Sequence, residues 1–395
     1  MSAHRIHRYI AREITIPALL GLLVFTFVLI LGRLLKLAEL VINQGVPLGQ
    51  ITTLFAYLMP TFLVITIPLG FLLGVLLGFT RLSTDNEITA FKSTGVSLYR
   101  LLRPVLFCAL AASMLTALAT LVIAPACKQL FRSQVFEIAL SQASIKLQPR
   151  TFNTDFDGLA IYANGVDEQS GTMQGILIAD ERSGNAPAVI LARSGRIIPD
   201  SSQMAVTLRL NDGTIHRKPE QKSGETYQLV SFANYDINLN LGQQTPSKES
   251  RYRKPSEYAL GELITSLRTA PDAVRRAGFS IELQRRLILP LAPLLFALIG
   301  VPLGIQSNRS GRSSGFALAL VVFLLYYMFL SLAQTLVEEK NFPVILTMWS
   351  PSILFFAASI YLLRITASER RLPLADWLRD RWRVARRLLR RRGLA

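Results

Sequence analysis

Two cations near the end of the first long apolar segment are the residues in this chain best suited to bind a ligand. Arg33 and Lys36 are three residues apart and so share a helix face. The same face continues back through Leu29 and Phe25. Arginine binds phosphate as a two-pronged donor and lysine as a point charge, so this face suits an anionic lipid. The alternative is that both cations only extend to the membrane surface, with Glu39 as a local partner of Lys36.

A polar stretch between the second and third apolar segments has the start and stop signals of a short helix at 83–95. Ser83 or Thr84 can cap its beginning, with Glu87 reaching back to a Thr84 cap, and Gly95 can end it. A short helix between two membrane spans, on the side where ATP is hydrolysed, is what a coupling element would require. The alternative is an ordinary loop helix in which Glu87 only completes the cap. The candidate coupling residues are Asp85, Glu87, Ile88, Phe91 and Gly95.

The sequence contains no convincing motif for an enzymatic site. No lysine follows a glycine, so a phosphate-binding loop is absent. The segment Gly311–Gly315 matches the G-x-S-x-G pattern of hydrolases, but it links two apolar segments and does not form a strand–turn–helix elbow. The histidines and cysteines form no cluster with metal-ligand spacing. We therefore expect no catalytic residue, metal or cofactor here. If ATP drives this protein, a separate ATPase subunit binds the ATP and Mg²⁺.

The composition is typical of a membrane protein. Hydrophobic residues make up 51% of the 395 positions, only 17% are charged and the mean hydropathy is +0.36. Six segments are long enough to cross a hydrocarbon layer about 30 Å thick. Their central parts carry no carboxylate or histidine that would indicate proton coupling or catalysis in the membrane. These segments are approximately 14–42, 51–79, 101–126, 284–306, 315–337 and 345–364.

The net charge of +17 is concentrated in four segments. The N-terminus, the loop 81–103, the link 309–312 and the tail from Arg364 together hold 20 basic residues against six acidic ones, a net charge of +14. They alternate along the chain with the uncharged link 43–50, the long insert and the turn at 338–340. The positive-inside rule therefore places both termini in the cytoplasm and the insert outside.

The long insert has the pattern of a β domain. From about 130 to 255 apolar and polar residues alternate, as at Val206, Leu208 and Leu210. Turn signals separate these runs, which predicts an all-β sandwich or jelly roll. The turn signals are Asn164-Gly165, Ser183-Gly184-Asn185 and Asn211-Asp212-Gly213.

The C-terminal tail is basic and amphipathic. Apolar residues from Leu374 to Leu389 recur at spacings of three and four with arginines on the other face, which predicts an anchor on the anionic inner leaflet. Nucleic-acid binding is the alternative function for a basic tail. Lipid binding is favoured because the tail follows a membrane span directly and carries Trp on its apolar face. The expected parts are residues 1–126 with spans one to three, 127–255 as the β domain, 256–283 as a helical connector, 284–364 with spans four to six, and 365–395 as the tail.

Several local strings, together with this order of parts, resemble the lipopolysaccharide export permeases LptF and LptG, the YjgP/YjgQ family. The resemblance covers essentially the whole chain. The segments Arg81–Thr89 and Gln334–Leu336 are closer to the LptF branch, and the LptG branch stays open. The strings are RYIARE at 8–13, EITAFKSTG at 87–95, ELQRRL at 282–287, PLAP at 290–293 and VPLG at 301–304.

The resemblance implies a function and a set of partners. In that family one LptF-like and one LptG-like subunit sit on a dimer of the ATPase LptB, with LptC on the periplasmic side of the bacterial inner membrane. Lipopolysaccharide would enter from the outer leaflet between the first and fifth spans of opposite subunits, and ATP-driven closure would pass it to the β-jelly-roll domains. Glu87 would then dock in the ATPase, and Arg33 with Lys36 would meet the phosphates of lipid A.

Two other classes of protein remain as alternatives. One is a different ABC permease for envelope lipids or lipoproteins, and the other is a structural envelope protein that tethers a β domain without transport. Co-purification of an ATPase would distinguish either kind of transporter from the structural protein. The identity of the bound lipid would distinguish a lipopolysaccharide permease from the other ABC permease.

Overall fold

The chain divides into two compact units. One comprises residues 1–36, 58–126 and 258–395, and the other comprises 37–57 and 127–257. Of the predicted tail, 365–395, residues 369–395 lie outside the described residues. A computed structural model describes residues 3–44, 47–146, 149–156, 158–167, 172–182, 188–200, 205–217, 228–239, 253–270, 272–306, 312–340 and 342–368.

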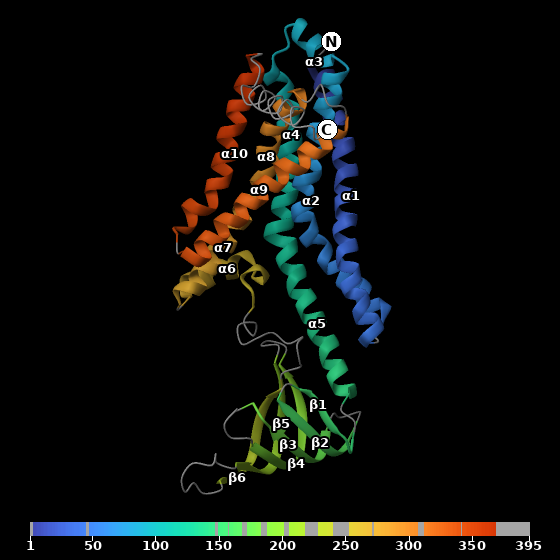
Figure 1. Cartoon of the computed structure of the whole chain (residues 1–395), viewed down its shortest axis with the longest axis vertical. Helices are drawn as coiled ribbons and strands as arrows, with labels where there is room; N and C mark the ends of the chain where they lie inside the picture. Colours follow the sequence, from blue (N-terminus) through green and yellow to red (C-terminus); the bar gives the residue numbers. More distant parts are fainter. Residues whose placement is uncertain are drawn as a thin grey trace, which may run out of the picture. The chain divides into compact units, whose positions relative to one another are not determined.

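The first unit is helical (Figure 1). Within the described part of the chain, six helical segments are apolar and long enough to cross a membrane, so the prediction of six spans is confirmed. The α-helices among the described residues are α1 (Ala3–Gln44), α2 (Leu48–Thr84), α3 (Glu87–Ser93), α4 (Leu98–Leu118), α5 (Ala124–Lys146), α6 (Leu260–Thr269), α7 (Ala273–Ile288), α8 (Ala292–Gln306), α9 (Arg312–Lys340) and α10 (Val344–Ala367).

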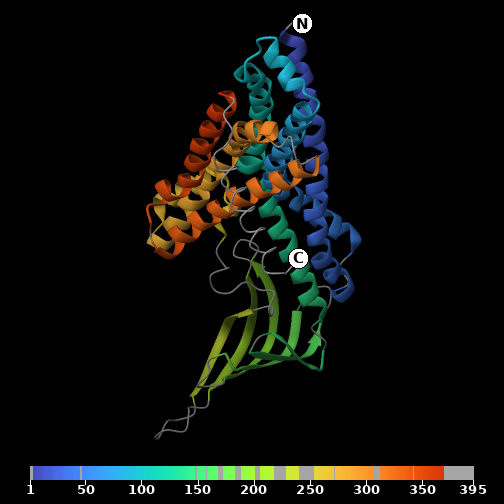
Figure 2. The same ribbon diagram turned by 45° about the horizontal axis from the view of Figure 1, so that its top comes forward.

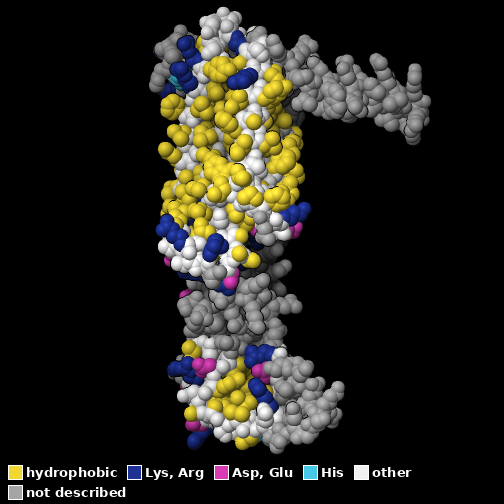
Figure 3. All heavy atoms as spheres, turned by 90° about the vertical axis from the view of Figure 1, so that its left-hand side faces the viewer, with side chains coloured by type: hydrophobic (Ala, Val, Ile, Leu, Met, Phe, Trp, Pro, Cys, Tyr) yellow, Lys and Arg dark blue, Asp and Glu magenta, His cyan; other side chains and the backbone are white. Residues whose placement is uncertain are grey.

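Two spans form the centre of this helical unit. In α2 and in the α7–α8 segment 72% of the most apolar stretch is buried, whereas only 17% is buried in α1. One apolar cluster joins α2 to α1, α4 and α8, and another joins α2 to α8 and α9. On the face of the unit shown in Figure 3, hydrophobic side chains form a broad belt with Lys and Arg gathered towards its ends. Such a belt bounded by cations suits contact with lipid.

A row of glycines on α2 lets α1 approach closely. A Cβ atom at Gly70 would lie 2.7 Å from the backbone nitrogen of Leu22, and one at Gly74 would lie 2.6 Å from the Cβ of Ala18. At Gly78 the nearest atom would be the carbonyl oxygen of Glu13, at 3.1 Å. The four-residue spacing of these glycines therefore serves packing of α1 on α2 inside one subunit, as small residues do between membrane helices.

The third span continues as helix beyond the predicted start of the β domain. α4 leads into a π-helical turn at Ala119–Ile123 and then into α5, which ends at Lys146. The prediction of strands from residue 130 is therefore wrong as far as 146. This stretch is rich in helix formers, which can extend an existing helix without a new nucleus. Its Phe136 packs into the apolar core of the sheet.

The second unit contains one antiparallel sheet of six strands in chain order, a meander that is strongly curved (Figure 2). Alternate residues such as Ile161, Ile178 and Leu208 are fully buried on one face. The prediction of β structure between the third and fourth spans is thus confirmed, whereas the sandwich or jelly-roll architecture stays a prediction. The strands are β1 (Phe152–Phe156), β2 (Leu159–Val166), β3 (Thr172–Asp180), β4 (Ala188–Asp200), β5 (Ala205–Arg217) and β6 (Gln228–Leu239).

Two of the predicted turns lie inside strands. Asn164-Gly165 belongs to β2, and Asn211-Asp212-Gly213 belongs to β5, where Asp212 has a φ of 52°. In β3, Gly175 has a φ of 60° opposite this level of β2. At both places the strand pairing is interrupted for one residue on each strand and then continues in the same register, so the turn-forming residues lie within continuous strands and do not reverse the chain. The third signal, 183–185, lies outside the described residues.

A bidentate ion pair joins the last two strands. The Arg209 guanidinium on β5 donates to both carboxylate oxygens of Asp236 on β6, at 2.8 and 2.9 Å. These hydrogen bonds lower the pKa of the Asp236 carboxyl group. The stabilisation of the sheet by this ion pair is therefore fully present above the ordinary pKa of an aspartate carboxyl group. It is lost as the pH falls through the lowered pKa of Asp236.

Candidate coupling and lipid-binding sites

The short helix α3 begins later than the sequence predicts. α2 continues through Thr84, and the chain turns at Asn86, with a φ of 57°, directly before Glu87. Both predicted caps are wrong. Ser83 donates to a carbonyl of α8 at 2.8 Å, and Thr84 donates to the carbonyl one turn back in α2, also at 2.8 Å. Their hydroxyl groups are thereby used inside the bundle, and no side chain caps α3.

The end of α3 is as predicted. Gly95 has a φ of 78°, which favours glycine. Its N–H donates to the carbonyl of Lys92 at 2.9 Å, and the N–H of Val96 donates to the carbonyl of Phe91 at 3.0 Å. These two bonds are the Schellman arrangement that ends a helix. Gly95 therefore fixes the exit of the chain from α3.

The apolar residues of α3 face the bundle. Ile88 is only 4% exposed and packs in the cluster that contains Leu82, Leu98 and Leu101, and Phe91 packs half-buried against the same cluster. Both side chains therefore anchor α3, and direct contact with a partner falls to its outer surface. We call this the outer face of α3: Thr89 and Ser93 of the helix together with Asp85 shortly before it, all exposed.

Polar contacts tie α3 and the end of α2 to the beginning of α1. The Tyr9 hydroxyl donates to a carboxylate oxygen of Glu87 at 2.9 Å. Arg81 forms an ion pair with Glu13 and lies 3.6 Å from a carboxylate oxygen of Asp85. We did not anticipate these partners from the residues of 83–95, because Tyr9 and Glu87 are 78 residues apart. The sequence signal that could have pointed to these contacts is the RYIARE string at 8–13, which contains both Tyr9 and Glu13.

The candidate lipid-binding face on α1 is partly occupied by the chain itself. Arg33 and Leu29 are exposed. Phe25 is half-buried, and its ring stacks on that of Phe316 in α9, with centroids 6.0 Å apart and planes at 17°. The fourth member, Lys36, lies outside the residues whose side chains the structure describes. Thus Leu29 and Arg33 remain open to a ligand, and Phe25 connects the first span to the fifth.

A buried ion pair at the beginning of the fourth span was not predicted. The Arg286 side chain is 2% exposed and donates to Glu282 at 2.9 Å and to the carbonyl of Tyr258 at 2.8 Å. Arg285 lies 3.8 Å from the same carboxylate. Because Glu282 and Arg286 are one helical turn apart, the pair is local in sequence, and only its burial required the structure.

No metal or hydrolase site is formed by the part of the chain that the structure describes. No group of three or more His, Cys, Asp or Glu residues there has the arrangement to hold a metal ion. Of the G-x-S-x-G match, Gly311 lies outside the described residues, and the remaining four residues begin α9.

Comparison with known proteins gives a consistent result. Residues 8–365 match the family described as lipopolysaccharide export system permease LptF/LptG. The lipopolysaccharide export system permease protein LptF of Escherichia coli K12 is 23% identical over 360 residues, which are 90% of this chain and 93% of that protein. The LptF of Shigella flexneri gives the same figures. An uncharacterized protein of Rickettsia prowazekii, RP871, is 25% identical over 271 residues, 67% of this chain and 72% of its own length.

Proposed function

The chain belongs to the lipopolysaccharide export system permease family LptF/LptG, and from that membership we propose that it is the LptF-type subunit of a transporter that extracts lipopolysaccharide from the outer leaflet of the bacterial inner membrane. The family match across residues 8–365 carries this proposal. The six apolar helices and the sheet between the third and fourth of them support it. Of the two subunit types, LptF is favoured by the relatives named LptF, which align over 90% of the chain. The LptG type is the alternative.

The energy for transport comes from a separate ATPase that binds ATP and Mg²⁺. An LptB-like ATPase dimer contacts the outer face of α3 and the Glu87 carboxylate. An LptG-like permease completes the membrane part, and an LptC-like protein continues the β path in the periplasm. The exposed position of the outer face of α3, at a helix held firmly by Ile88 and Gly95, supports this assignment.

The contacts of α1 explain how a movement of α3 reaches the lipid. α1 is joined to α3 by the Tyr9–Glu87 hydrogen bond and to α2 by the Glu13–Arg81 ion pair. Along its length it packs on the glycine row of α2. The open end of the same helix carries Leu29 and Arg33. A displacement of α3 by the ATPase is therefore transmitted to the residues that meet lipopolysaccharide.

We expect Glu87→Ala to weaken association with the ATPase roughly tenfold, since a hydrogen bond to a charged group is worth about 1.5–3 kcal/mol. Tyr9→Phe removes only the hydroxyl that orients Glu87 and should have a smaller effect in the same direction. Titration of the purified ATPase onto the permease complex measures both. Glu339→Ala, at an exposed carboxylate near the end of α9, is the matched control. Unchanged affinity in Glu87→Ala would contradict the coupling assignment.

A second prediction concerns the lipid. With a photocrosslinker at position 29, the double variant Arg33→Gln, Lys36→Gln should form several-fold fewer lipopolysaccharide adducts, because two charge-assisted contacts to phosphate are lost. Arg103→Gln, at an exposed cation of α4, should leave the adducts unchanged. Equal adduct yields in the double variant and the wild type would mean that Arg33 and Lys36 only extend to the membrane surface.

The orientation is proposed from the distribution of basic residues. A cysteine at Asn211 in β5 should react with a membrane-impermeant maleimide from the periplasmic side of intact cells, and a cysteine at Ser93 in α3 should react only after the inner membrane is opened. The opposite pattern would place the β domain in the cytoplasm. In the proposed orientation the sheet forms one module of a periplasmic jelly-roll path.

A further inference from the structure

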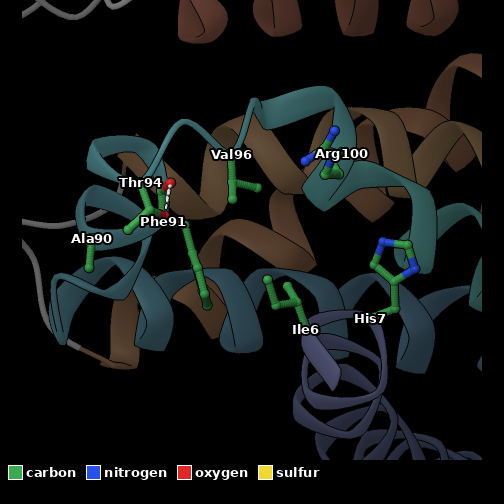
Figure 4. Close-up of a pocket in the computed structure, with 7 residues that line it drawn as sticks. All are labelled: Ile6, His7, Ala90, Phe91, Thr94, Val96 and Arg100. Atoms are coloured by element: carbon green, nitrogen blue, oxygen red, sulfur yellow. Dashed lines mark hydrogen bonds between the residues drawn. The ribbon is translucent and has the colours of Figure 1, made fainter. Parts of the chain in front are cut away.

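A cavity of about 500 Å³ lies beside α3, apart from the outer-leaflet lipid site proposed above. Three elements contribute to it: the beginning of α1, the helix α3 with the turn that follows it, and the beginning of α4 (Figure 4). Its lining combines apolar side chains with two groups that can bind an anion. The lining residues are Ile6, His7, Ala90, Phe91, Thr94, Val96 and Arg100.

The two nitrogen-bearing side chains of the cavity have no protein partner in the described structure. His7 Nε2 is buried and makes no hydrogen bond to any residue that the structure describes. Arg100 is exposed and forms no ion pair within the described ranges. In Figure 4 both side chains lie on the same side of the cavity, His7 on α1 and Arg100 on α4. An anion held there would give both groups a partner.

The beginning of α4 adds a third source of positive potential. Its N-cap residue, Ser97, forms no side-chain cap, so the N–H groups of Leu98 and Tyr99 in the first turn of this 21-residue helix remain available, whereas the N–H of Arg100 donates to the carbonyl of Ser97. Val96 and Arg100, which line the cavity, lie on either side of these groups. A helix N-terminus with an arginine in its first turn favours phosphate, which accepts several hydrogen bonds at once.

The exposed residues around the cavity indicate that it lies at the level of lipid headgroups. Tyr99 is 55% exposed and Tyr9 is 38% exposed, and tyrosines gather at membrane interfaces. Phe107 is 76% exposed. It lies about 10 Å beyond Arg100 along α4, at a rise of 1.5 Å per residue. The surface of α4 thus changes from cationic to apolar within two turns. The apolar lining of Ile6, Phe91 and Val96 suits the glycerol and first acyl carbons of a lipid.

We propose that this cavity binds the phosphate diester headgroup of an anionic glycerophospholipid, with Arg100, His7 and the N-terminus of α4 as its ligands. The bound lipid contacts α3 as well as α1 and α4, so it joins the three elements of the coupling region. This site differs in ligand and in position from Arg33 and Lys36.

Native mass spectrometry of the full-length protein in detergent tests the proposal. Phosphatidylglycerol and phosphatidylcholine are offered together in mixed micelles. The wild-type protein should retain phosphatidylglycerol in preference, and Arg100→Gln or His7→Leu should each reduce its retention roughly tenfold, as expected for loss of a hydrogen bond to a charged group. Arg103→Gln, one turn further along α4, should not. Arg100→Lys should recover part of the retention because the charge remains.

Four results would overturn the proposal. Equal retention of both lipids would show that the cavity does not select an anionic headgroup. Equal losses in Arg100→Gln and Arg103→Gln would show a non-specific charged surface. Binding of inorganic phosphate that depends on Arg100, without retention of phosphatidylglycerol, would identify a site for free phosphate. Release of the ATPase by Arg100→Gln with unchanged lipid retention would identify a protein interface.

Discussion

Replacing Arg286 by methionine should lower the free energy of unfolding by about 3–5 kcal/mol, the usual cost of removing one partner of a buried ion pair. The reason is the carboxylate that remains. Glu282 is 8% exposed, and the remaining cation near its carboxylate among the described residues would be Arg285, at 3.8 Å. The carbonyl of Tyr258 would also lose the hydrogen bond that Arg286 donates. Thermal or SDS-induced unfolding in detergent measures the loss.

Two further variants separate charge from packing. Arg285→Met removes a cation whose side chain is 38% exposed, so it should cost no more than about 1 kcal/mol. The double variant Glu282→Met, Arg286→Met removes both buried charges and should regain most of the stability lost in the single variant. A double variant as unstable as Arg286→Met alone would show that the bond to Tyr258, and not the unpaired carboxylate, dominates.

The spans were predictable because each is encoded within one continuous segment. An apolar run of sufficient length needs no knowledge of its neighbours to be recognised, and α2 is the clearest case. The glycine row of α2 was also predictable as a packing surface, since small residues four apart share a face. The sequence did not show that the surface is covered by α1, or that a second pair, Gly300 and Gly304 on α8, approaches α2 at Val75 and Phe79.

The candidate coupling site was only partly predictable, because its details depend on distant parts of the chain. Gly95 ends α3 through hydrogen bonds within the six residues from Phe91 to Val96, and the sequence indicated this correctly. The beginning of α3 was predicted wrongly, because the Ser83 hydroxyl finds a carbonyl of α8, 222 residues away. The partner of Glu87 is Tyr9, from another helix. Local rules for capping cannot include such acceptors.

The β domain shows the opposite error, in which local signals were right and their consequence was wrong. Asp212 does adopt a φ that turn-forming residues favour. Its neighbour Gly213 must be glycine, because a Cβ there would overlap the ring of Phe232 and the carbonyl of Leu191. Yet β5 pairs with β4 on both sides of Asp212 in the same register, through Asn211 and Gly213. Whether a turn-forming residue reverses a strand or lies within it depends on the partners that pair on both sides.

Gly74→Leu should have the largest effect of any single substitution in α2. The first atom of the new side chain would lie closer to the Ile14 carbonyl and to Ala18 than real Cβ atoms come, and both belong to the helix backbone or its shortest side chain. No rotamer relieves this overlap, so α1 and α2 must separate along the whole glycine row. The separation would also strain the Tyr9–Glu87 and Glu13–Arg81 contacts at the end of α1. Overpacking alone costs about 1–3 kcal/mol, and the lost helix contacts add to it.

We therefore expect Gly74→Leu to leave little folded protein in the membrane, measured by fluorescence-detected size exclusion of the detergent extract. Gly32→Leu is the matched control, because a Cβ at Gly32 meets nothing within 4 Å and the new side chain is equally apolar. Gly74→Ala should be intermediate, since it adds the clashing Cβ without the branched remainder. If Gly74→Leu folds like Gly32→Leu but the complex hydrolyses ATP without moving lipopolysaccharide, then α1 does not need α2 for folding and needs it only to receive the motion of α3.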